Sequence, residues 1–240
     1  SPILEGSYRP KNARERYSPS LTLEQAFASS SNVASVRLFS QLGSRRVIKT
    51  ARDLGVTSDL PTGDASLALG TSTMTLLELT SAYAAIAANA YPVEPHAFPR
   101  AEQGWFEWLF DGQSRFRSST HAGMERLLRS AINRGTGRAA MLPVPNFGKT
   151  GTTQDYRDAL FVGYAGDLVV GVWVGKDDNS PLPGVTGGAL PARIWRDFMR
   201  SALRGAAGPA PTAIPDPEGP VQPLDIENLD QIPLDENGST

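Results

Sequence analysis

The sequence predicts an α+β fold in which helical segments come first and an antiparallel sheet flanked by helices follows. Two observations carry this prediction. Residues 22–55 and the segment from Thr75 show helical patterns with clear start and stop residues, whereas residues 159–175 contain two β-rich runs joined by a turn. With 240 residues, of which 40% are hydrophobic, the chain is long enough to bury a substantial core.

The first three predicted helices follow from their flanking residues. Thr22 and Gln25 fit a capping box, in which each side chain satisfies a backbone N–H of the other. Four small polar residues then interrupt the pattern, and a second helix leads to a glycine stop. Ser44 is predicted to cap the third helix. The expected helices occupy residues 22–29, 32–43 and 44–55 and together form a helical subdomain.

The middle of the chain contains two further helical patterns. Thr75 and Glu78 form a second capping box before an alanine-rich apolar helix, and the segment starting at Thr120 reads as a helix ending near Gly135. Between these helices, residues 91–118 contain only short apolar patterns and are rich in aromatic residues, which favours strands or a hairpin.

The end of the chain changes to strand periodicity. Residues 159–164 and 168–175 are predicted to form a hairpin across Ala165, Gly166 and Asp167, followed by the amphipathic helix "LPARIWRDFMRSALRG". From Gly205 onward the sequence has seven prolines, seven acidic residues and no Lys or Arg, so a linker-like tail is expected. The rest of the chain has 23 basic and 18 acidic residues.

Composition narrows the function classes. The absence of cysteine excludes a disulfide framework and a thiolate metal site, and nothing in the sequence suggests a metal or an organic cofactor. No apolar run approaches the length of a membrane-spanning helix. The mildly basic body would suit a polyanionic environment, but this charge is ordinary, and we expect no nucleic-acid partner.

The segment "NFGKTGTTQDYRDALFVGY" contains Gly148-Lys149-Thr150, the second half of a phosphate-binding loop. Such a loop places its first glycine where this sequence has Pro143, and Pro145 follows. Prolines lack the N–H groups that must bind the phosphates. A helix should also follow the threonine, whereas a strand pattern does. The sequence therefore excludes a phosphate loop.

Lys149-Thr150-Gly151 instead fits an edge strand that lines an acyl-transfer cleft. A lysine supplies positive charge there, threonine hydroxyls can bind a carboxylate, and a glycine lets substrate backbone approach closely. The tripeptide alone is a weak indication, and so is Ser30-Ser31-Asn32, because serine and asparagine are common helix caps. Only the two motifs together, in this order along the chain, strengthen the interpretation.

Four separated segments carry a resemblance to a known family. In order they are "LTLEQAFASSSNVASVRLFSQLG", "LALGTSTMTLLELTSAYAAIAAN", "GTGRAA" and "GKTGTTQDYRDALFVGYAGDLVVGVWVGKDD". They resemble the transpeptidase domain of class A penicillin-binding proteins over most of residues 8–203. The resemblance implies a penicillin-binding/β-lactamase-like fold, with a partial transpeptidase domain over residues 1–204 and a tail over 205–240.

The resemblance also implies an activity and the residues that serve it. The family's enzymes are serine acyltransferases that cross-link peptidoglycan stem peptides and bind β-lactams. By position, Ser30 would relay a proton to the leaving amine, Asn32 would hydrogen-bond the substrate amide, and Lys149 would supply positive potential.

The same positional match assigns substrate contacts to the residues that follow the lysine. The Thr150 and Thr152 hydroxyls would bind the substrate carboxylate, Gly151 would allow close approach, and the Thr152 N–H would form half of the oxyanion hole. We expect the parent protein to be membrane-anchored on the periplasmic side and to carry a glycosyltransferase domain.

The family's nucleophile, the serine of Ser-x-x-Lys, is missing from this sequence. The residues three positions before the four lysines are Tyr8, Arg46, Asn146 and Trp173. Two explanations remain open. The nucleophile lies upstream in a larger enzyme, or the chain is a non-catalytic relative that binds wall peptides or a partner. In either case the 240-residue chain alone is predicted to be inactive.

Overall fold

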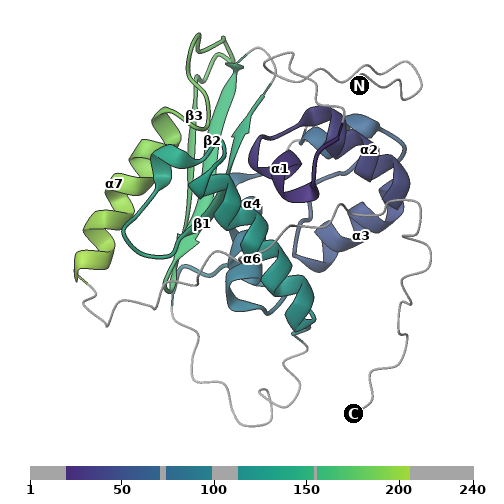
Figure 1. The fold of residues 1–240 in the computed structure, drawn as a ribbon, viewed down its shortest axis with the longest axis horizontal. Coiled ribbons are helices and arrows are strands. Elements are labelled where there is room, and N and C mark those ends of the chain that lie inside the picture. Colours follow the sequence, from purple (N-terminus) through teal and green to yellow (C-terminus); the bar gives the residue numbers. More distant parts are fainter. Residues whose placement is uncertain (1–19, 71–73, 99–112, 154–155, 206–240) are drawn as a thin grey trace.

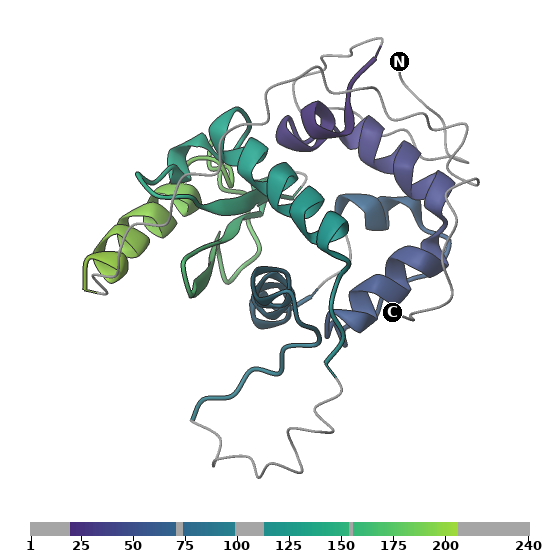
Figure 2. The ribbon, with the colours of Figure 1, turned by 60° about the horizontal axis from the view of Figure 1, so that its bottom comes forward.

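The computed structural model describes residues 20–70, 74–98, 113–153 and 156–205, and its central element is a three-stranded antiparallel sheet (Figure 1). The strands are β1 (Phe147–Thr152), β2 (Asp158–Ala165) and β3 (Leu168–Gly175), in the order β1-β2-β3. Helix α7 (Leu190–Gly205) covers one face of the sheet and the remaining helices lie on the other side (Figures 1 and 2). The predicted α+β class is confirmed.

The predicted hairpin is formed by β2 and β3. Asp158 pairs with Gly175 at one end and Ala165 with Leu168 at the other, so that only Gly166 and Asp167 lie in the turn. Ala165, which was expected in the connection, is the last strand residue. Gly166 has φ 55°, a left-handed value that suits glycine.

The first helices are α1 (Leu23–Ala28), α2 (Asn32–Leu42) and α3 (Ser44–Asp53). The capping box is confirmed: the Gln25 N–H donates to Thr22 Oγ1 at 3.2 Å, and the Thr22 N–H donates to Gln25 Oε1 at 3.1 Å. The predicted Ser44 cap is wrong. Gly43, with φ 81°, ends α2 and directly precedes α3, so no residue is left between the helices for a side-chain cap.

Helices α4 (Leu76–Ala88) and α6 (Ser118–Asn133) follow, with short 3₁₀ turns η1 (Ala65–Leu69) and η2 (Arg138–Ala140). The second capping box, Thr75 with Glu78, is confirmed. In the region predicted as strands or a hairpin, Tyr91 and Ser114 form an isolated antiparallel bridge, and residues 99–112 lie outside the described part of the chain.

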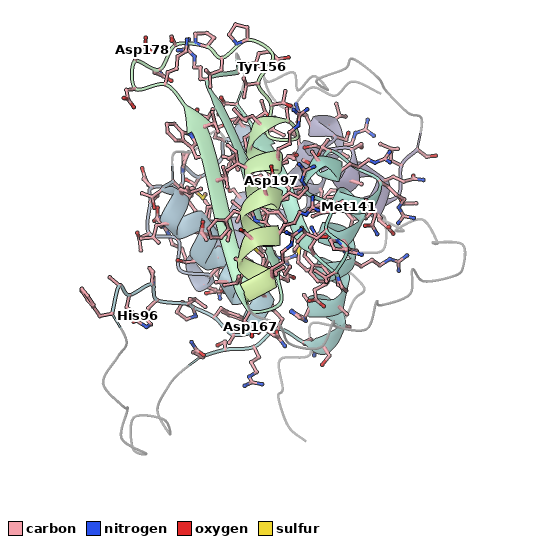
Figure 3. All side chains as sticks on the ribbon, turned by 90° about the vertical axis from the view of Figure 1, so that its left-hand side faces the viewer. His96, Met141, Tyr156, Asp167, Asp178 and Asp197 are labelled. Carbon is pink, nitrogen blue, oxygen red and sulfur yellow. The ribbon has the colours of Figure 1, made fainter. Side chains whose placement is uncertain are left out.

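The core has one part on each face of the sheet. On the α7 face, Trp195 and Met199 are fully buried, and the Trp195 ring lies 5.1 Å from that of Phe161. The Trp195 indole N–H donates to the carbonyls of Gly163 and Val170, which fixes α7 across β2 and β3. Figure 3 looks onto this face, where Asp197 marks α7 and Asp167 marks the β2–β3 turn.

The opposite face of the sheet packs against α4 and α6. Tyr164 of β2 is buried with Leu128 of α6 and Ile86 of α4. Within the described ranges, no helix has both the length and the apolar character needed to cross a membrane. The predicted tail lies outside the described residues from position 206, so the proposed boundary at 204/205 stays a prediction.

Candidate active site

Ser30 occupies a strained turn between α1 and α2. Its φ of 55° lies in the left-handed region, which costs a residue with a Cβ atom on the order of 1 kcal/mol or more. Its neighbours hold the turn: the Ser29 hydroxyl donates to the Gln25 carbonyl at 2.7 Å, and Ser31 caps α2. The Ser30 side chain is exposed, while Asn32 begins α2 and is half-buried.

Lys149 lies on β1, which is an edge strand of the described sheet. Because side chains alternate along a strand, Lys149 shares its face with Phe147, whose ring stacks on Tyr164 at 4.9 Å. That face is opposite α7 and packs against α4 and α6. Gly148, Lys149 and Thr150 therefore form part of a strand and not a phosphate-binding loop, as predicted from the sequence.

The structure brings Lys149 and Ser30 into contact although 119 positions separate them in the sequence. The Lys149 Nζ donates to Ser30 Oγ at 3.0 Å and to the Thr150 carbonyl at 3.2 Å. It also lies 5.7 Å from the centre of the Phe27 ring, within the range of a cation–π interaction. The ammonium group thus reaches from the edge strand to the end of α1.

Burial lowers the pKa of Lys149 to about 8. Desolvation penalises the ammonium form, and among the described residues no carboxylate compensates for it. The group is therefore still mainly protonated at neutral pH, but it is held in a partly desolvated position. A cation in such a position interacts more strongly with an incoming anion than a fully solvated lysine does.

Thr150 and Thr152 point to the other face of β1, where both hydroxyls already have a partner. The Thr150 and Thr136 hydroxyl oxygens lie 2.6 Å apart, and Thr152 Oγ1 accepts the Gly187 N–H at 3.0 Å. Gly187 lies so close to the strand that a Cβ atom there would overlap the Gly151 carbonyl oxygen. The segment at Gly187 therefore packs directly on the backbone of β1.

Gly151 is close-packed on the face of β1 that it shares with Lys149, opposite α7. A Cβ atom at this position would lie 2.7 Å from Leu160 Cδ1 of the neighbouring strand. Any larger residue would thus have to displace Leu160. The strand tolerates close approach here because the residue is a glycine.

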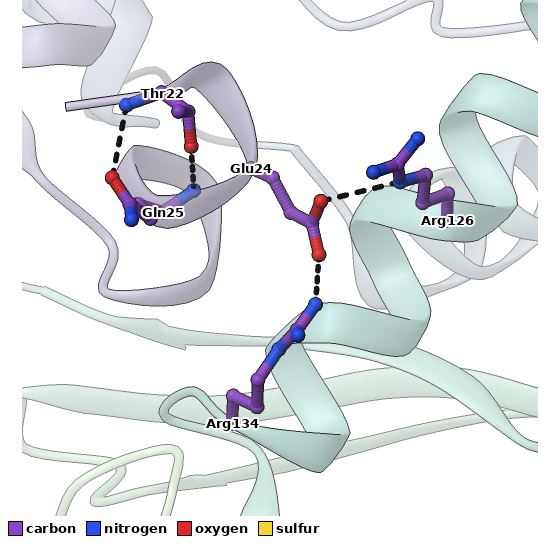
Figure 4. A network of polar contacts seen from close by, with 5 residues as sticks. All are labelled: Thr22, Glu24, Gln25, Arg126 and Arg134. Atoms are coloured by element: carbon purple, nitrogen blue, oxygen red, sulfur yellow. Dashed lines mark hydrogen bonds and ion pairs between the residues drawn. The ribbon is translucent and has the colours of Figure 1, made fainter. Parts of the chain in front are cut away.

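A buried carboxylate fixes α1 against α6 (Figure 4). Glu24 is buried, its Oε2 lies 3.2 Å from Arg126 Nε, and its Oε1 pairs with Arg134. Since Phe27 and Ser30 follow Glu24 within two turns of chain, this pair of contacts helps to position both. The start of β1 is held in a similar way, because Arg129 Nη1 donates to the buried Asn146 at its carbonyl and at Oδ1.

Of the residues predicted from the sequence, namely Ser30, Asn32 and residues 149–152, Ser30 and Lys149 lie in direct contact in the structure. No role was predicted for Phe27 or Thr136 from the sequence. Phe27 was identified only as part of an apolar helix face, and its contact with Lys149 depends on tertiary packing. Thr136 lies in the quoted segment "GTGRAA", which is the one indication that could have drawn attention to it. Within the described stretches, no cluster of His, Asp and Glu could hold a metal ion.

A comparison with protein families connects this geometry to relatives. The family model for the penicillin binding protein transpeptidase domain matches residues 5–200. The chain belongs to this transpeptidase domain family. The resemblance seen in the sequence is thereby confirmed, and curated relatives agree with it.

Relatives of this transpeptidase domain include penicillin-binding protein 1A of Neisseria meningitidis, which is 32% identical over 221 residues and is matched by 84% of the chain. Penicillin-binding protein 2D of Bacillus subtilis is 32% identical over 213 residues, covering 83% of the chain. The chain spans 27% of the length of the first of these proteins and 30% of the second.

Solved structures show the same fold. Penicillin-Binding Protein 1A from Haemophilus influenzae superposes with a TM-score of 0.72 at 23% identity, covering 90% of this chain and 40% of that chain. The PonA1 protein from Mycobacterium tuberculosis, solved in complex with penicillin V, gives 0.69 at 24% identity, covering 91% and 65%. The penicillin-binding transpeptidase fold predicted for the chain is confirmed.

Proposed function

We propose that this transpeptidase domain supplies one wall of a DD-transpeptidase cleft that cross-links peptidoglycan stem peptides and is acylated by β-lactams. The 3.0 Å contact between Lys149 Nζ and Ser30 Oγ carries the proposal. It joins the two motifs that the sequence linked only by their order. A purely structural lysine on an edge strand would be expected to point into solvent rather than to accept partial desolvation.

In the proposed reaction, the serine of a Ser-x-x-Lys segment outside these 240 residues attacks the carbonyl of the penultimate D-Ala. The amide C–N bond breaks, an ester to the serine forms, and the terminal D-Ala leaves with a proton on its amine. An amine of a neighbouring stem peptide then attacks the ester, which releases the serine and forms the cross-link. A β-lactam would undergo the first step by opening its ring.

The proposal assigns to Ser30 the role of proton donor to the leaving amine. Because the Lys149 ammonium can only donate, Ser30 Oγ accepts that hydrogen bond and its own proton remains available for the amine. At ~4 Å and an effective dielectric of about 20, the lysine charge contributes on the order of 4 kcal/mol beside a developing anion, before desolvation costs. Asn32, at the start of α2, would hydrogen-bond the substrate amide.

On the strand side, the proposal assigns recognition of the substrate carboxylate to Thr150 and Thr152, and close approach of the substrate backbone to Gly151. The Thr152 N–H would contribute half of the oxyanion hole. Since the chain spans 27% of its relative penicillin-binding protein 1A, we further propose a longer parent protein. That parent would carry the Ser-x-x-Lys segment, a glycosyltransferase domain and a membrane anchor, and it would act on the periplasmic side.

Labelling with a fluorescent penicillin tests the proposal. The full-length protein, meaning the complete natural polypeptide that contains these residues, should form a covalent adduct on the serine of a Ser-x-x-Lys segment. The 240-residue chain alone should form none. A stable adduct on the chain alone would contradict the assignment of the nucleophile.

The alternative function is a non-catalytic module that binds wall peptides or a partner, which applies if the full-length protein also lacks a Ser-x-x-Lys segment. In that case the full-length protein would bind isolated peptidoglycan but would form no adduct with penicillin. The two proposals thus differ in the outcome of the same labelling experiment.

A further inference from the structure

Thr136 bridges the two parts of the candidate site. Its backbone N–H donates to the carbonyl of Ala28, two residues before Ser30, at 3.1 Å. Its hydroxyl oxygen lies 2.6 Å from that of Thr150 on the edge strand. One exposed residue thus contacts both the end of α1 and the strand that carries Lys149.

The surroundings of Thr136 hold it in this place. A Cβ atom on the preceding Gly135 would overlap the Ala28 carbonyl, and one on Gly188 would overlap the carbonyl oxygen of Thr136 itself. The hypothetical Cβ of Gly188 would also lie 3.7 Å from Thr150 Cγ2. Thr136 is therefore enclosed by close backbone contacts on two sides while its hydroxyl meets Thr150.

The chemistry of a hydroxyl pair determines which oxygen donates once an anion is bound. A hydroxyl has one proton and two lone pairs, and a carboxylate can only accept. If Thr150 gives its proton to a carboxylate, the proton in the 2.6 Å contact must come from Thr136. Thr152 is arranged in the same way, because its oxygen already accepts from the Gly187 N–H and its proton is left to donate.

We propose that Thr136 is a positioning residue: its hydroxyl donates to Thr150 Oγ1 and so directs the Thr150 proton toward the carboxylate of the substrate or of a β-lactam. This inference rests on the proposed function. A hydroxyl that accepts one hydrogen bond is a better donor in the next, so the pair binds an anion more strongly than Thr150 alone.

The test compares Thr136→Val, which keeps the shape and removes the hydroxyl, with Thr136→Ser, which keeps the hydroxyl. The second-order rate constant of acylation is measured in the full-length protein with benzylpenicillin and with its methyl ester. We expect Thr136→Val to lower the rate with the free acid about tenfold, which corresponds to the upper range for one hydrogen bond between neutral groups. Thr136→Ser should stay within about threefold of wild type.

The ester separates positioning from a structural defect. It has no carboxylate, so wild type and Thr136→Val should react with it at equal rates. In a Thr150→Val background, adding Thr136→Val should change nothing further, because Thr136 acts only through Thr150. Equal loss on acid and ester, failure of serine to restore the rate, or an additive double variant would overturn the inference.

The outcomes also separate this inference from the proposed function. If the wild-type protein is acylated and Thr136→Val reacts with the free acid as fast as wild type, the inference alone is wrong. If the wild-type protein is not acylated at all, the proposed function fails and the role of Thr136 fails with it. Urea unfolding of each variant confirms that the rates compare folded proteins.

Discussion

Replacing Lys149 by methionine should make the folded chain more stable at neutral pH although it removes a residue of the candidate site. Burial lowers the pKa of Lys149 from 10.5 to about 8, so the native state holds the charged form at a cost. One pKa unit corresponds to about 1.4 kcal/mol, which gives an upper limit of about 3 kcal/mol at pH 7. The lysine is half-buried and keeps part of its solvation, so we expect a gain of about 1–3 kcal/mol.

The sign of the pH dependence follows from proton linkage. Because the folded-state pKa is depressed, the unfolded chain binds more protons than the native chain between about pH 8 and about pH 10.5. The destabilisation caused by Lys149 therefore becomes smaller as the pH rises through this window. The free energy of unfolding of the wild-type chain rises accordingly, and that of the methionine variant lacks this rise. The advantage of the variant should fall by more than half between about pH 7 and about pH 9.5.

Urea unfolding of the 240-residue chain, followed by circular dichroism at both pH values, measures the effect. Lys176→Met is the matched control, because Lys176 is exposed and should give no comparable gain. A Lys149→Met variant that is less stable than wild type at neutral pH would refute the reasoning. So would a difference between the two proteins that does not change with pH.

Three further predictions concern contacts that hold the helices and the turn before Thr136 in place. Glu24→Gln should lower the free energy of unfolding by about 1–3 kcal/mol, since two charged hydrogen bonds to α6 are weakened; an unchanged urea midpoint would contradict this. Gly135→Ala should cost about 1–3 kcal/mol by overpacking against Ala28 and should slow acylation of the full-length protein, whereas a neutral effect on both would show that the backbone yields easily. Hydrogen bonds from Ser58, Thr75 and Thr57 hold the pKa of Glu78 well below its usual range. Glu78→Gln should therefore destabilise the chain most at neutral pH, and progressively less as the pH falls below the unfolded-state pKa of Glu78. A destabilisation that grows in acid would contradict this prediction.

Local sequence patterns predicted the helices and strands well because their causes are local. The capping boxes at Thr22 and Thr75 need only residues three positions apart, and the β2–β3 hairpin needs only its own turn. The Ser44 cap was predicted wrongly because the start of α3 depends on tertiary packing and not on local sequence alone. Whether α2 and α3 share a single glycine between them depends on how the two helices meet, and residue type alone does not determine that.

The candidate site was predictable as a set of motifs but not as a geometry. The order of Ser30–Asn32 and Lys149–Gly151 indicated a cleft, yet the contact of Lys149 with Phe27 and its lowered pKa arise from packing between α1 and β1. Thr136 was missed because the segment "GTGRAA" contributed only to the family resemblance, and the residue type alone does not indicate a contact with Thr150. Its proposed role depends on its contact with the Thr150 hydroxyl, which only the folded structure brings close.

The contact between Lys149 and Ser30 is the centre of this account, and one rate constant tests it most directly. The second-order rate constant for acylation by benzylpenicillin should be measured in the full-length protein before and after Lys149→Ala. If the lysine supplies charge beside Ser30 and the substrate carboxylate, the rate should fall by at least about 100-fold, which is less than the full Coulomb energy allows. A folded Lys149→Ala protein that is acylated within about threefold of wild type would contradict the central claim.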